Sequence, residues 1–438
     1  MNVSLLSALR VVARADSDPT RTVLFESLAA RSPLVRLARR LTQGPLRGRL
    51  PSVLAIALYG TYTARVCLAA PHAAPVWALA LFENDRRQID RVREWVGADR
   101  VAYSPSGLHL AIAASRALPS ALRGGRVLRY LRCVGRLCRR FGFLVSCRTA
   151  SALACAMVAG GALRHPGPRA VLVSSDYNAE AVGLVHAGRR TGMATIYVAH
   201  APTHHLSPPL HFTLAVLDGE AALDVYRRKG PVRARCVYKG VEGREAPLDP
   251  EALARPRPVI GLFLPKEVNW QAFRQLVTEA RRTLAPARIL VRWHPNAQDR
   301  PALRDVLDDA SGVESRPAVA SLDEDARDCD WVVADRNSSV PLTALKAGVP
   351  VLVVPGLAVF PGEQTDLYGL VADRVVPPPC ASFAATPPES QVAFYRSGWR
   401  DRFRRHDGSY ERPPEAVARD VREAVLEVAA GASPTASA

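Results

Sequence analysis

Residues 331–354 read Trp-Val-Val-Ala-Asp-Arg-Asn-Ser-Ser-Val-Pro-Leu-Thr-Ala-Leu-Lys-Ala-Gly-Val-Pro-Val-Leu-Val-Val, and this stretch decides the fold class. Two short apolar runs, 331–334 and 349–354, have the length of buried strands. The residues between them form a helical pattern with Pro341 in its first turn and Gly348 at its end. A third apolar run at 287–293 precedes them. Short buried strands alternating with a helix predict an open parallel sheet of the Rossmann type.

Polar residues follow two of these strands, at the edge where open parallel sheets bind their ligands. His294 and Pro295 follow the first run, and Asn337, Ser338 and Ser339 follow the second, directly before the helix. Hydroxyls and backbone N–H groups at a helix start suit a phosphate, to which His294 can donate a further hydrogen bond. Either feature alone is common as a simple cap or turn. Their occurrence at the ends of two strands that we expect to be neighbours in one sheet predicts a phosphate-binding site.

The composition describes a globular chain with an unusual charge. Its 438 residues are enough for two domains, and 48% of them are hydrophobic. The formal net charge is +17, and only four of the 58 basic residues are lysines. Part of this excess reflects an arginine-rich composition; the remainder predicts an anionic partner such as a nucleotide, a membrane surface or an acidic polysaccharide. Nucleic acid is disfavoured, because no zinc-finger, RRM-like or homeodomain-like pattern is present.

The cysteines and the hydropathy indicate where the protein works. The eight cysteines have no CxxC spacing, which is typical of buried thiols in a reducing compartment. We find no signal-peptide pattern and no uninterrupted run of about 18 apolar residues. These observations predict a cytoplasmic protein.

The first half of the chain predicts a second parallel sheet. Strand-like apolar runs lie at 76–82, 100–103, 170–173, 194–198 and 212–217. The strands at 170–173 and 194–198 are joined by a helical pattern at 179–190, so Asp176 and His200 are predicted at the same carboxyl edge. Asp218 follows the next strand.

These residues are candidates for proton transfer. We expect His200 to be the general base, with Asp176 and Asp218 behind it. A second interpretation has His200 orient a neighbouring carboxylate that takes the proton, and Glu83 and Asp85 lie on the same half.

A change of composition divides the chain. We predict a first domain at 1–245, a Pro- and Glu-rich linker at 246–258 and a second domain at 259–412, followed by a helix at 413–430 and a disordered tail at 431–438. In the second domain, Lys266 and Arg292 end strands beside the expected phosphate, and Glu363 lies in a loop that can reach a ribose or an acceptor.

Two segments are basic and amphipathic. Residues 1–50 alternate apolar pairs with arginines, and Arg126–Arg140 places arginines on one helical stripe. A solvated surface explains both. Peripheral contact with the inner, anionic face of a membrane is the alternative, and an acidic glycan is a further candidate for the second segment.

His294-Pro295 followed by Ser338-Ser339 resembles the HP and SS motifs of bacterial glycosyltransferases with two Rossmann-like domains, the GT-B architecture. These include sialyltransferases, polysialyltransferases, capsule Kdo transferases and CDP-glycerol glycerophosphotransferases. The resemblance covers roughly residues 170–374 and is specific at the two motifs. It implies that these residues hold the cytidine nucleotide of a CMP-sugar or CDP-linked donor.

The resemblance also has departures. Several relatives carry a glutamate in the helix after the two serines, where this chain has Thr343, so the ribose contact of that carboxylate is in doubt. In the glycerophosphotransferases the last strand of the first domain ends in His-Gly, and that histidine is the proposed base; here Ala201 follows His200. The family also implies that the late helix packs back on the first domain.

The sequence thus predicts an α/β protein with two Rossmann-like domains facing across a cleft, a helical N-terminal segment and a C-terminal helix. The predicted function is an inverting glycosyltransferase with a CMP-sugar donor, such as sialic acid or Kdo, or a CDP-linked donor. It would build a bacterial surface polysaccharide or glycolipid on a glycan or lipid-linked acceptor.

We expect no cofactor and no metal, because no DxD pair follows a strand on the nucleotide half and Asp323-Glu324-Asp325 is predicted to start a helix. Two alternatives stay open. One is a catalytically silent scaffold that binds a nucleotide or lipid headgroup, and the other is a UDP-sugar enzyme of GT-B architecture, such as a non-hydrolysing epimerase.

Overall fold

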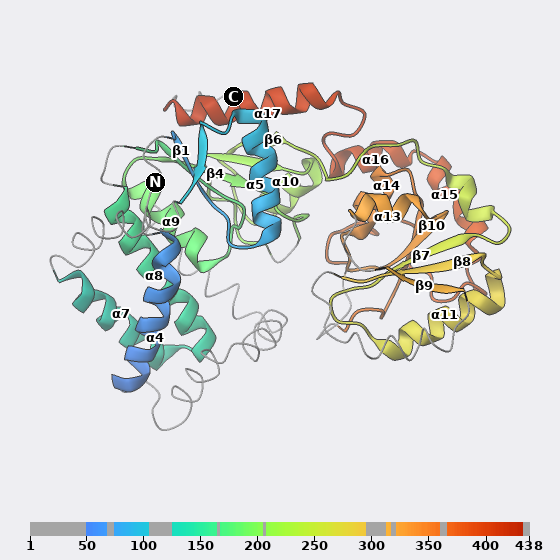
Figure 1. Ribbon diagram of the computed structural model, residues 1–438, viewed down its shortest axis with the longest axis horizontal. Helices are drawn as coiled ribbons and strands as arrows, with labels where there is room; N and C mark the ends of the chain where they lie inside the picture. The colour runs from blue at the N-terminus through green and yellow to red at the C-terminus, as the bar shows by residue number, and fades with distance from the viewer. Residues whose placement is uncertain are drawn as a thin grey trace.

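The computed structural model describes residues 50–67, 74–104, 125–163, 167–204, 207–294, 312–316, 321–359 and 366–431. Two parallel sheets form the cores of two α/β domains, which lie side by side in Figure 1. The prediction of two Rossmann-like domains is therefore confirmed. The predicted basic helix at 1–49 and all but the first residue of the predicted tail lie outside the described residues.

The first sheet has six parallel strands in the order β2-β1-β3-β4-β5-β6. They are β1 Val76–Leu79, β2 Val101–Tyr103, β3 Ala170–Val173, β4 Ala194–Val198, β5 Leu214–Leu217 and β6 Arg235–Tyr238. Alternate side chains enter different cores, as the period of a strand requires. Trp77 and Leu79 pack with α8 (Phe143–Ala162) and α9 (Ala179–Arg190), whereas Val76 and Ala78 pack with helices on the other face.

The helices on that other face come from opposite ends of the chain. They are α5 (Glu83–Val96) and α17 (Pro414–Ala429), and both contribute buried residues to one cluster. Figure 1 shows α17 lying along the first domain after the chain has left the second. The expected return of the late helix is confirmed. The segments β3, α9 and β4 have the predicted limits, and α17 begins and ends one residue inside the predicted 413–430.

One described helix, α8, has the length and hydropathy of a membrane span. Its apolar window, Val145–Ala162, is 72% buried within the protein. It packs against α9 and α4 (Leu50–Thr63), and a Cβ on Gly183 of α9 would lie 2.5 Å from the Ala152 carbonyl oxygen. Core packing between helices accounts for the apolar composition of α8.

The second sheet has five parallel strands in the order β11-β10-β7-β8-β9. They are β7 Val259–Phe263, β8 Arg288–Arg292, β9 Val313–Arg316, β10 Trp331–Asp335 and β11 Val351–Val354. The described helices of this domain are α11 Trp270–Leu284, α13 Leu322–Arg327, α14 Val340–Lys346, α15 Val392–Arg396 and α16 Trp399–His406. Gly348 follows α14 with φ +81°, a left-handed conformation that suits glycine and ends the helix as predicted.

The segment predicted as a linker packs against the second domain. The backbone N–H groups of Ala246 and Asp249 donate to the carbonyls of Lys346 and Gly348, and Leu253 is buried in the second core. These contacts attach residues 246–253 to the end of α14, so the segment packs as part of the second domain.

Candidate active site

Three neighbouring strands of the first sheet bring Asp85, Ser174 and His200 together at its carboxyl edge. Asp85 follows β1, Ser174 follows β3 and His200 follows β4, and these strands are adjacent. The Nδ1 atom of His200 bonds to the Ser174 carbonyl oxygen and lies 3.7 Å from Asp85 Oδ1. A carbonyl oxygen only accepts, so Nδ1 carries the proton and Nε2 carries the lone pair in the neutral ring. The arrangement presents a basic nitrogen at the edge of the sheet.

Asp85 is fixed in place by the start of α5. Its Oδ2 accepts hydrogen bonds from the backbone N–H groups of Leu81 and Phe82, at 3.2 and 3.3 Å. The side chain is only 1% exposed. Burial raises the pKa of Asp85, while His200 and the two backbone hydrogen bonds act in the opposite direction. Oδ1 accepts no hydrogen bond among the described residues and is the oxygen that faces His200.

The two carboxylates expected behind His200 have other partners. Asp176 Oδ2 accepts a hydrogen bond from the Tyr226 hydroxyl at 2.9 Å. Asp218 Oδ1 lies 2.5 Å from the ammonium group of the buried Lys239. The carboxylate that faces His200 is instead Asp85. From the sequence, Asp85 was predicted on this half without a role of its own, because an acid in the first turn of a helix is usually explained by the helix dipole.

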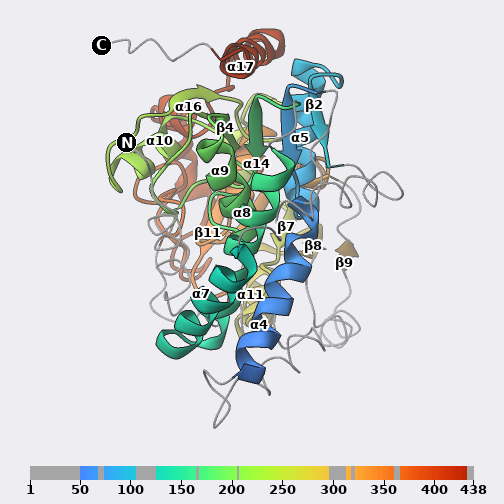
Figure 2. The same ribbon diagram turned by 90° about the vertical axis from the view of Figure 1, so that its left-hand side faces the viewer.

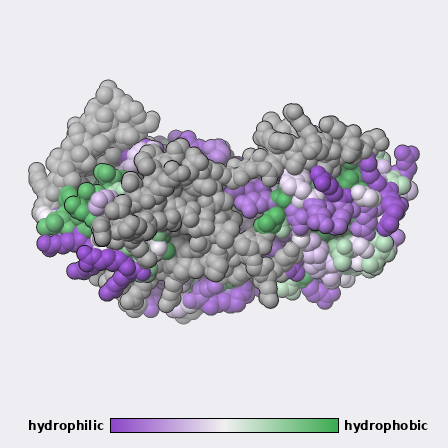
Figure 3. Space-filling model, turned by 90° about the horizontal axis from the view of Figure 1, so that it is seen from below, coloured by the Kyte–Doolittle hydropathy of each residue, from purple (hydrophilic) through white to green (hydrophobic). Residues whose placement is uncertain are grey.

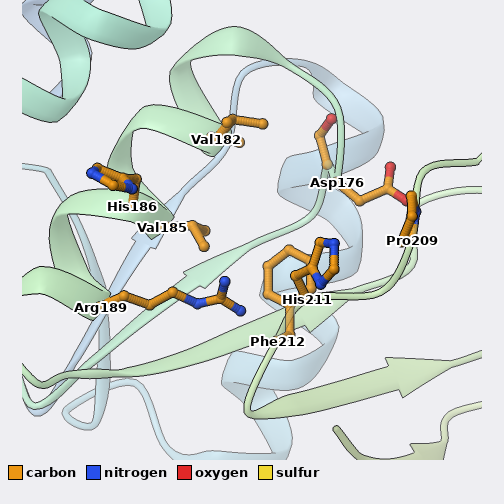
Figure 4. Close-up of a pocket in the computed structure, with 10 residues that line it drawn as sticks. Asp176, Val182, Val185, His186, Arg189, Pro209, His211 and Phe212 are labelled. Atoms are coloured by element: carbon orange, nitrogen blue, oxygen red, sulfur yellow. The ribbon is translucent and has the colours of Figure 1, made fainter. Parts of the chain in front are cut away.

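A small cavity lies on the other side of Asp176. Its volume is about 50 Å³, and it is lined by Asp176, one face of α9 and the segment that precedes β5. Figure 4 shows Arg189 extending from α9 toward His211. Burial and the Arg189 charge lower the pKa of His211. A cavity of this volume has room for water molecules but is too small for a sugar.

A larger cavity separates the two domains. It measures about 270 Å³ and is lined by the loop after β4 and α10 (Glu220–Arg227) on one side, and by α14, residues 366–373 and α16 on the other. His204, in the His200 loop, lies 6.2 Å from Tyr368 between ring centroids. Burial raises the pKa of Tyr368 to about 12, and the Ser339 side chain acts in the opposite direction. This chain of contacts joins the His200 loop to the predicted phosphate site.

The carboxyl edge of the second sheet differs from the expected arrangement in one respect. We expected the strands before His294 and Ser338 to be neighbours, but β7 lies between β8 and β10. Lys266, which follows β7, therefore occupies the centre of this edge. Burial lowers the pKa of His294, and the charges of Lys266 and Arg292 lower it further. His294 is thus neutral near pH 7 and can donate one hydrogen bond.

The loop between β10 and α14 is organised by Asp335, which is 2% exposed. Its Oδ1 accepts from the Asn337 N–H and its Oδ2 from the Ala358 N–H, both at 2.9 Å. Ser338 Oγ accepts from the Val340 N–H, and Asn337 Oδ1 accepts from the Leu367 N–H at 3.0 Å. Ser338 and Asn337 thus shape the loop that leads into α14.

Arg292 is held within the second domain. Its side chain is 9% exposed and forms an ion pair with Asp325 of α13. Ser321 and Glu324 form a capping box at the start of that helix, so the acidic run is a helix start, as predicted. We place Arg292 in the packing of the domain and leave it out of the proposed donor contacts.

Three predicted donor contacts remain. Thr343 lies beside Gly243, in the segment where the chain passes from the first domain to the second. A Cβ on Gly243 would be 3.3 Å from the Thr343 Cγ2. Pro295 and Glu363 lie outside the described residues. Among the described residues, no three His, Cys, Asp or Glu side chains are grouped as metal ligands would be. Metal independence stays a prediction.

No protein family model matches the chain, and no curated protein sequence matches it. Several solved structures are similar in architecture. CalG4, the calicheamicin glycosyltransferase, is 12% identical over 82% of this chain and 100% of that chain, with a TM-score of 0.48. MnaA of S. aureus, in a co-structure with UDP, is 11% identical over 81% and 96%, with a TM-score of 0.46. The glycosyltransferase SnogD from Streptomyces nogalater is 14% identical over 80% and 99%, with a TM-score of 0.42.

Proposed function

We propose that this protein is a glycosyltransferase that moves a sugar from a nucleotide-activated donor to an acceptor hydroxyl. The observation that carries the proposal is the histidine of the first domain, whose Nδ1 is held by a carbonyl and a buried carboxylate. The loop that bears it contacts the second domain through Tyr368, next to the serine motif. A base on the first domain and a phosphate site on the second are the two components that glycosyl transfer needs.

The proposed step is a single displacement. The acceptor oxygen forms a bond to the anomeric carbon while the bond from that carbon to the donor phosphate oxygen breaks. His200 Nε2 takes the proton of the acceptor hydroxyl, and Asp85 stabilises the resulting imidazolium. The leaving phosphate keeps the electron pair and is stabilised by Lys266, His294 and the Ser339 region. Attack from the side opposite the leaving group inverts the anomeric carbon.

We further propose a cytidine-activated donor, a CMP-sugar or a CDP-linked compound. His294-Pro295 and Ser338-Ser339 support this choice through their resemblance to the HP and SS motifs. The acceptor is a glycan or lipid-linked saccharide, and the site of action is the cytoplasm. Metal independence is supported by the acidic run: Asp325 pairs with Arg292, and Asp323 accepts from the Arg244 N–H and pairs with Arg327.

The test is thermal stabilisation of the purified full chain by CMP, CDP, UDP, GDP and ADP, each with and without EDTA. A ligand at about 100 times its dissociation constant adds roughly 2.7 kcal/mol to the stability of the form that binds it. For the predicted nucleotide-binding domain at 259–412, we expect this free energy to raise the melting temperature by about 5–10 °C. Selective stabilisation by CMP or CDP that survives EDTA is the expected result.

Other outcomes would change the conclusion. Stabilisation by UDP alone would replace the cytidine donor with a uridine donor on the same architecture. The absence of stabilisation by any nucleotide would contradict the phosphate site. The catalytically silent scaffold would be favoured if a nucleotide stabilised the protein, no acceptor tried gave turnover, and His200→Gln left the nucleotide stabilisation unchanged.

A further inference from the structure

Three helices of the first domain form a layer that extends away from its sheet. They are α4, α7 (Arg126–Arg140) and α8, and every pair among them is in contact. Figures 1 and 2 show this layer, here called the helical layer, on the side of the domain opposite α17. Neither the proposed donor site nor His200 lies in it, so its surface chemistry needs its own explanation.

The outer face of α7 is a row of arginines. Tyr130, Val134 and Cys138 form its buried face. The exposed arginines on the remaining face are Arg129, Arg132, Arg136, Arg139 and Arg140. In the described parts of the layer, residues 50–67 and 125–163, there are eight arginines and no aspartate or glutamate. A solvated helix face commonly alternates charges of both signs, so this surface is built for an anionic partner.

The outer face of α4 is apolar, which a solvated helix does not require. Leu50, Leu54 and Leu58 are 69%, 42% and 70% exposed, and Tyr62 continues the row at 53%. Their spacing of four residues places them on one stripe of the helix. At its end, the Arg65 guanidinium lies 3.9 Å from the centre of the Tyr62 ring. Leucines followed by a tyrosine and an arginine match the order of groups from the acyl chains to the headgroups of a bilayer.

The two faces are held in fixed relation. The Tyr130 hydroxyl of α7 donates to the Ala57 carbonyl of α4 at 3.0 Å. Gly60 permits this approach, because a Cβ there would lie 2.4 Å from that hydroxyl. Figure 3, which looks at this end from below, shows hydrophobic and hydrophilic surface side by side at its left.

We propose that the helical layer docks on the surface of an anionic lipid bilayer, with the leucines of α4 in the interface and the arginines of α7 on the headgroups. The charge selects anionic lipid, and the apolar stripe distinguishes a bilayer from a soluble polyanion. The inference rests on the exposed residues of α4 and α7 and not on the proposed transferase function. It deepens that function, because a surface-bound enzyme meets a lipid-linked acceptor.

The test is co-sedimentation of the full chain with vesicles of phosphatidylcholine, with or without phosphatidylglycerol. We expect binding to the anionic vesicles only, and release when NaCl is raised from about 0.05 to about 0.5 M, because salt screens exposed charges. The variant Arg132→Gln/Arg136→Gln/Arg139→Gln is expected to bind roughly 100-fold more weakly. Leu54→Ser/Leu58→Ser is expected to bind at least about 10-fold more weakly.

A charge-matched control removes three exposed arginines from other surfaces: Arg274→Gln/Arg282→Gln/Arg422→Gln. We expect it to bind as the wild type does, and all variants to keep their melting temperature and their stabilisation by nucleotide. Retained nucleotide stabilisation separates a failure here from a failure of the transferase proposal.

Equal binding to neutral vesicles, or equal losses in the control and the α7 variant, would overturn the proposal. So would unchanged binding of the leucine variant. Binding to soluble polysialic acid without binding to anionic vesicles would identify the layer as a glycan-binding face instead.

Discussion

The substitution Asp85→Asn separates the role of Asp85 in proton transfer from its role in folding. Asparagine keeps the shape of the side chain and one oxygen that can accept from the Leu81 and Phe82 N–H groups. It removes the charge that faces His200. The magnitude follows from geometry: at 3.7 Å, with an effective dielectric constant between that of water and about 20, the pair contributes about 1–4 kcal/mol once His200 is protonated.

That interaction exists fully only after His200 has taken the proton, so its loss raises the barrier rather than weakening the ground state. We expect kcat to fall by about 5–900-fold, because each 1.36 kcal/mol corresponds to a factor of ten. The Ser174 carbonyl still holds the His200 ring in Asp85→Asn, so we expect this variant to lose less activity than His200→Gln. For His200→Gln we expect kcat to fall by about 100–10,000-fold.

Stability is expected to move in the opposite direction. Because burial raises the pKa of Asp85, the free energy of unfolding falls as the pH rises through that pKa, and the ionised group is a cost at pH 7. A neutral amide avoids this cost, so the melting temperature at pH 7 should stay the same or rise.

The assay is transfer rate against donor concentration, together with a thermal melt and nucleotide stabilisation. The control is Glu94→Gln, an exposed acid on the same helix. A fall in kcat with unchanged KM for the donor, in a protein as stable as the wild type, is the expected result. An unchanged kcat, or an equal loss in the Glu94 variant, would refute the positioning role of Asp85.

Two further predictions concern the second domain. His294→Ala is expected to weaken nucleotide binding by about 10–100-fold, whereas His200→Ala keeps that affinity and loses turnover. The pKa of His294 is lowered in the free protein, and a bound phosphate should raise it because the anion stabilises the protonated ring. Nucleotide affinity, measured by calorimetry, should therefore increase as the pH falls from 7 toward 5. An affinity that does not change with pH would contradict the contact between His294 and the phosphate. The buried Lys346 lies 2.9 Å from Asp407, so Lys346→Met should lower the free energy of unfolding by about 3–5 kcal/mol in urea titration. Lys229→Met, on the exposed surface, is the control, and a loss of equal size there would contradict the buried pair.

The strands and several helices could be predicted from the sequence because short stretches of neighbouring residues determine where they begin and end. An apolar run bounded by Ser174 or by Gly348 carries its own start and end signals, and such signals depend on a few neighbouring residues. The order of strands is not local. Placing β7 between β8 and β10 depends on how the crossover helices pack, which no single stretch encodes. For this reason Lys266 was predicted near the phosphate, but its central place on the edge was not.

The candidate base could be predicted, and its partner could not. His200 follows a clear strand, so its edge of the sheet follows from the pattern. Asp85 meets it from two strands away in the sheet and 115 positions earlier in the chain. Asp176 is closer in sequence, but its carboxylate is oriented toward Tyr226. Asp335 was missed for a related reason, since a polar residue at the end of a buried strand has no pattern that distinguishes a loop organiser from a ligand contact.

Two segments of the chain connect the domains, and residues beside them line the cavity between the domains. The chain leaves the first domain after Lys239 and returns through 407–412, and Lys346 of the second domain binds both crossings, through the Val241 carbonyl and the Ser409 hydroxyl, at 2.8 Å each. The groups next to these crossings line the cavity: Asp218 pairs with Lys239, and His406 precedes Asp407. Buried charges that lose their partners are costly, so a relative movement of the domains has to turn about these contacts rather than break them. We therefore expect any movement of one domain against the other to keep the contacts of Lys346 and Asp407, beside the cavity between the domains.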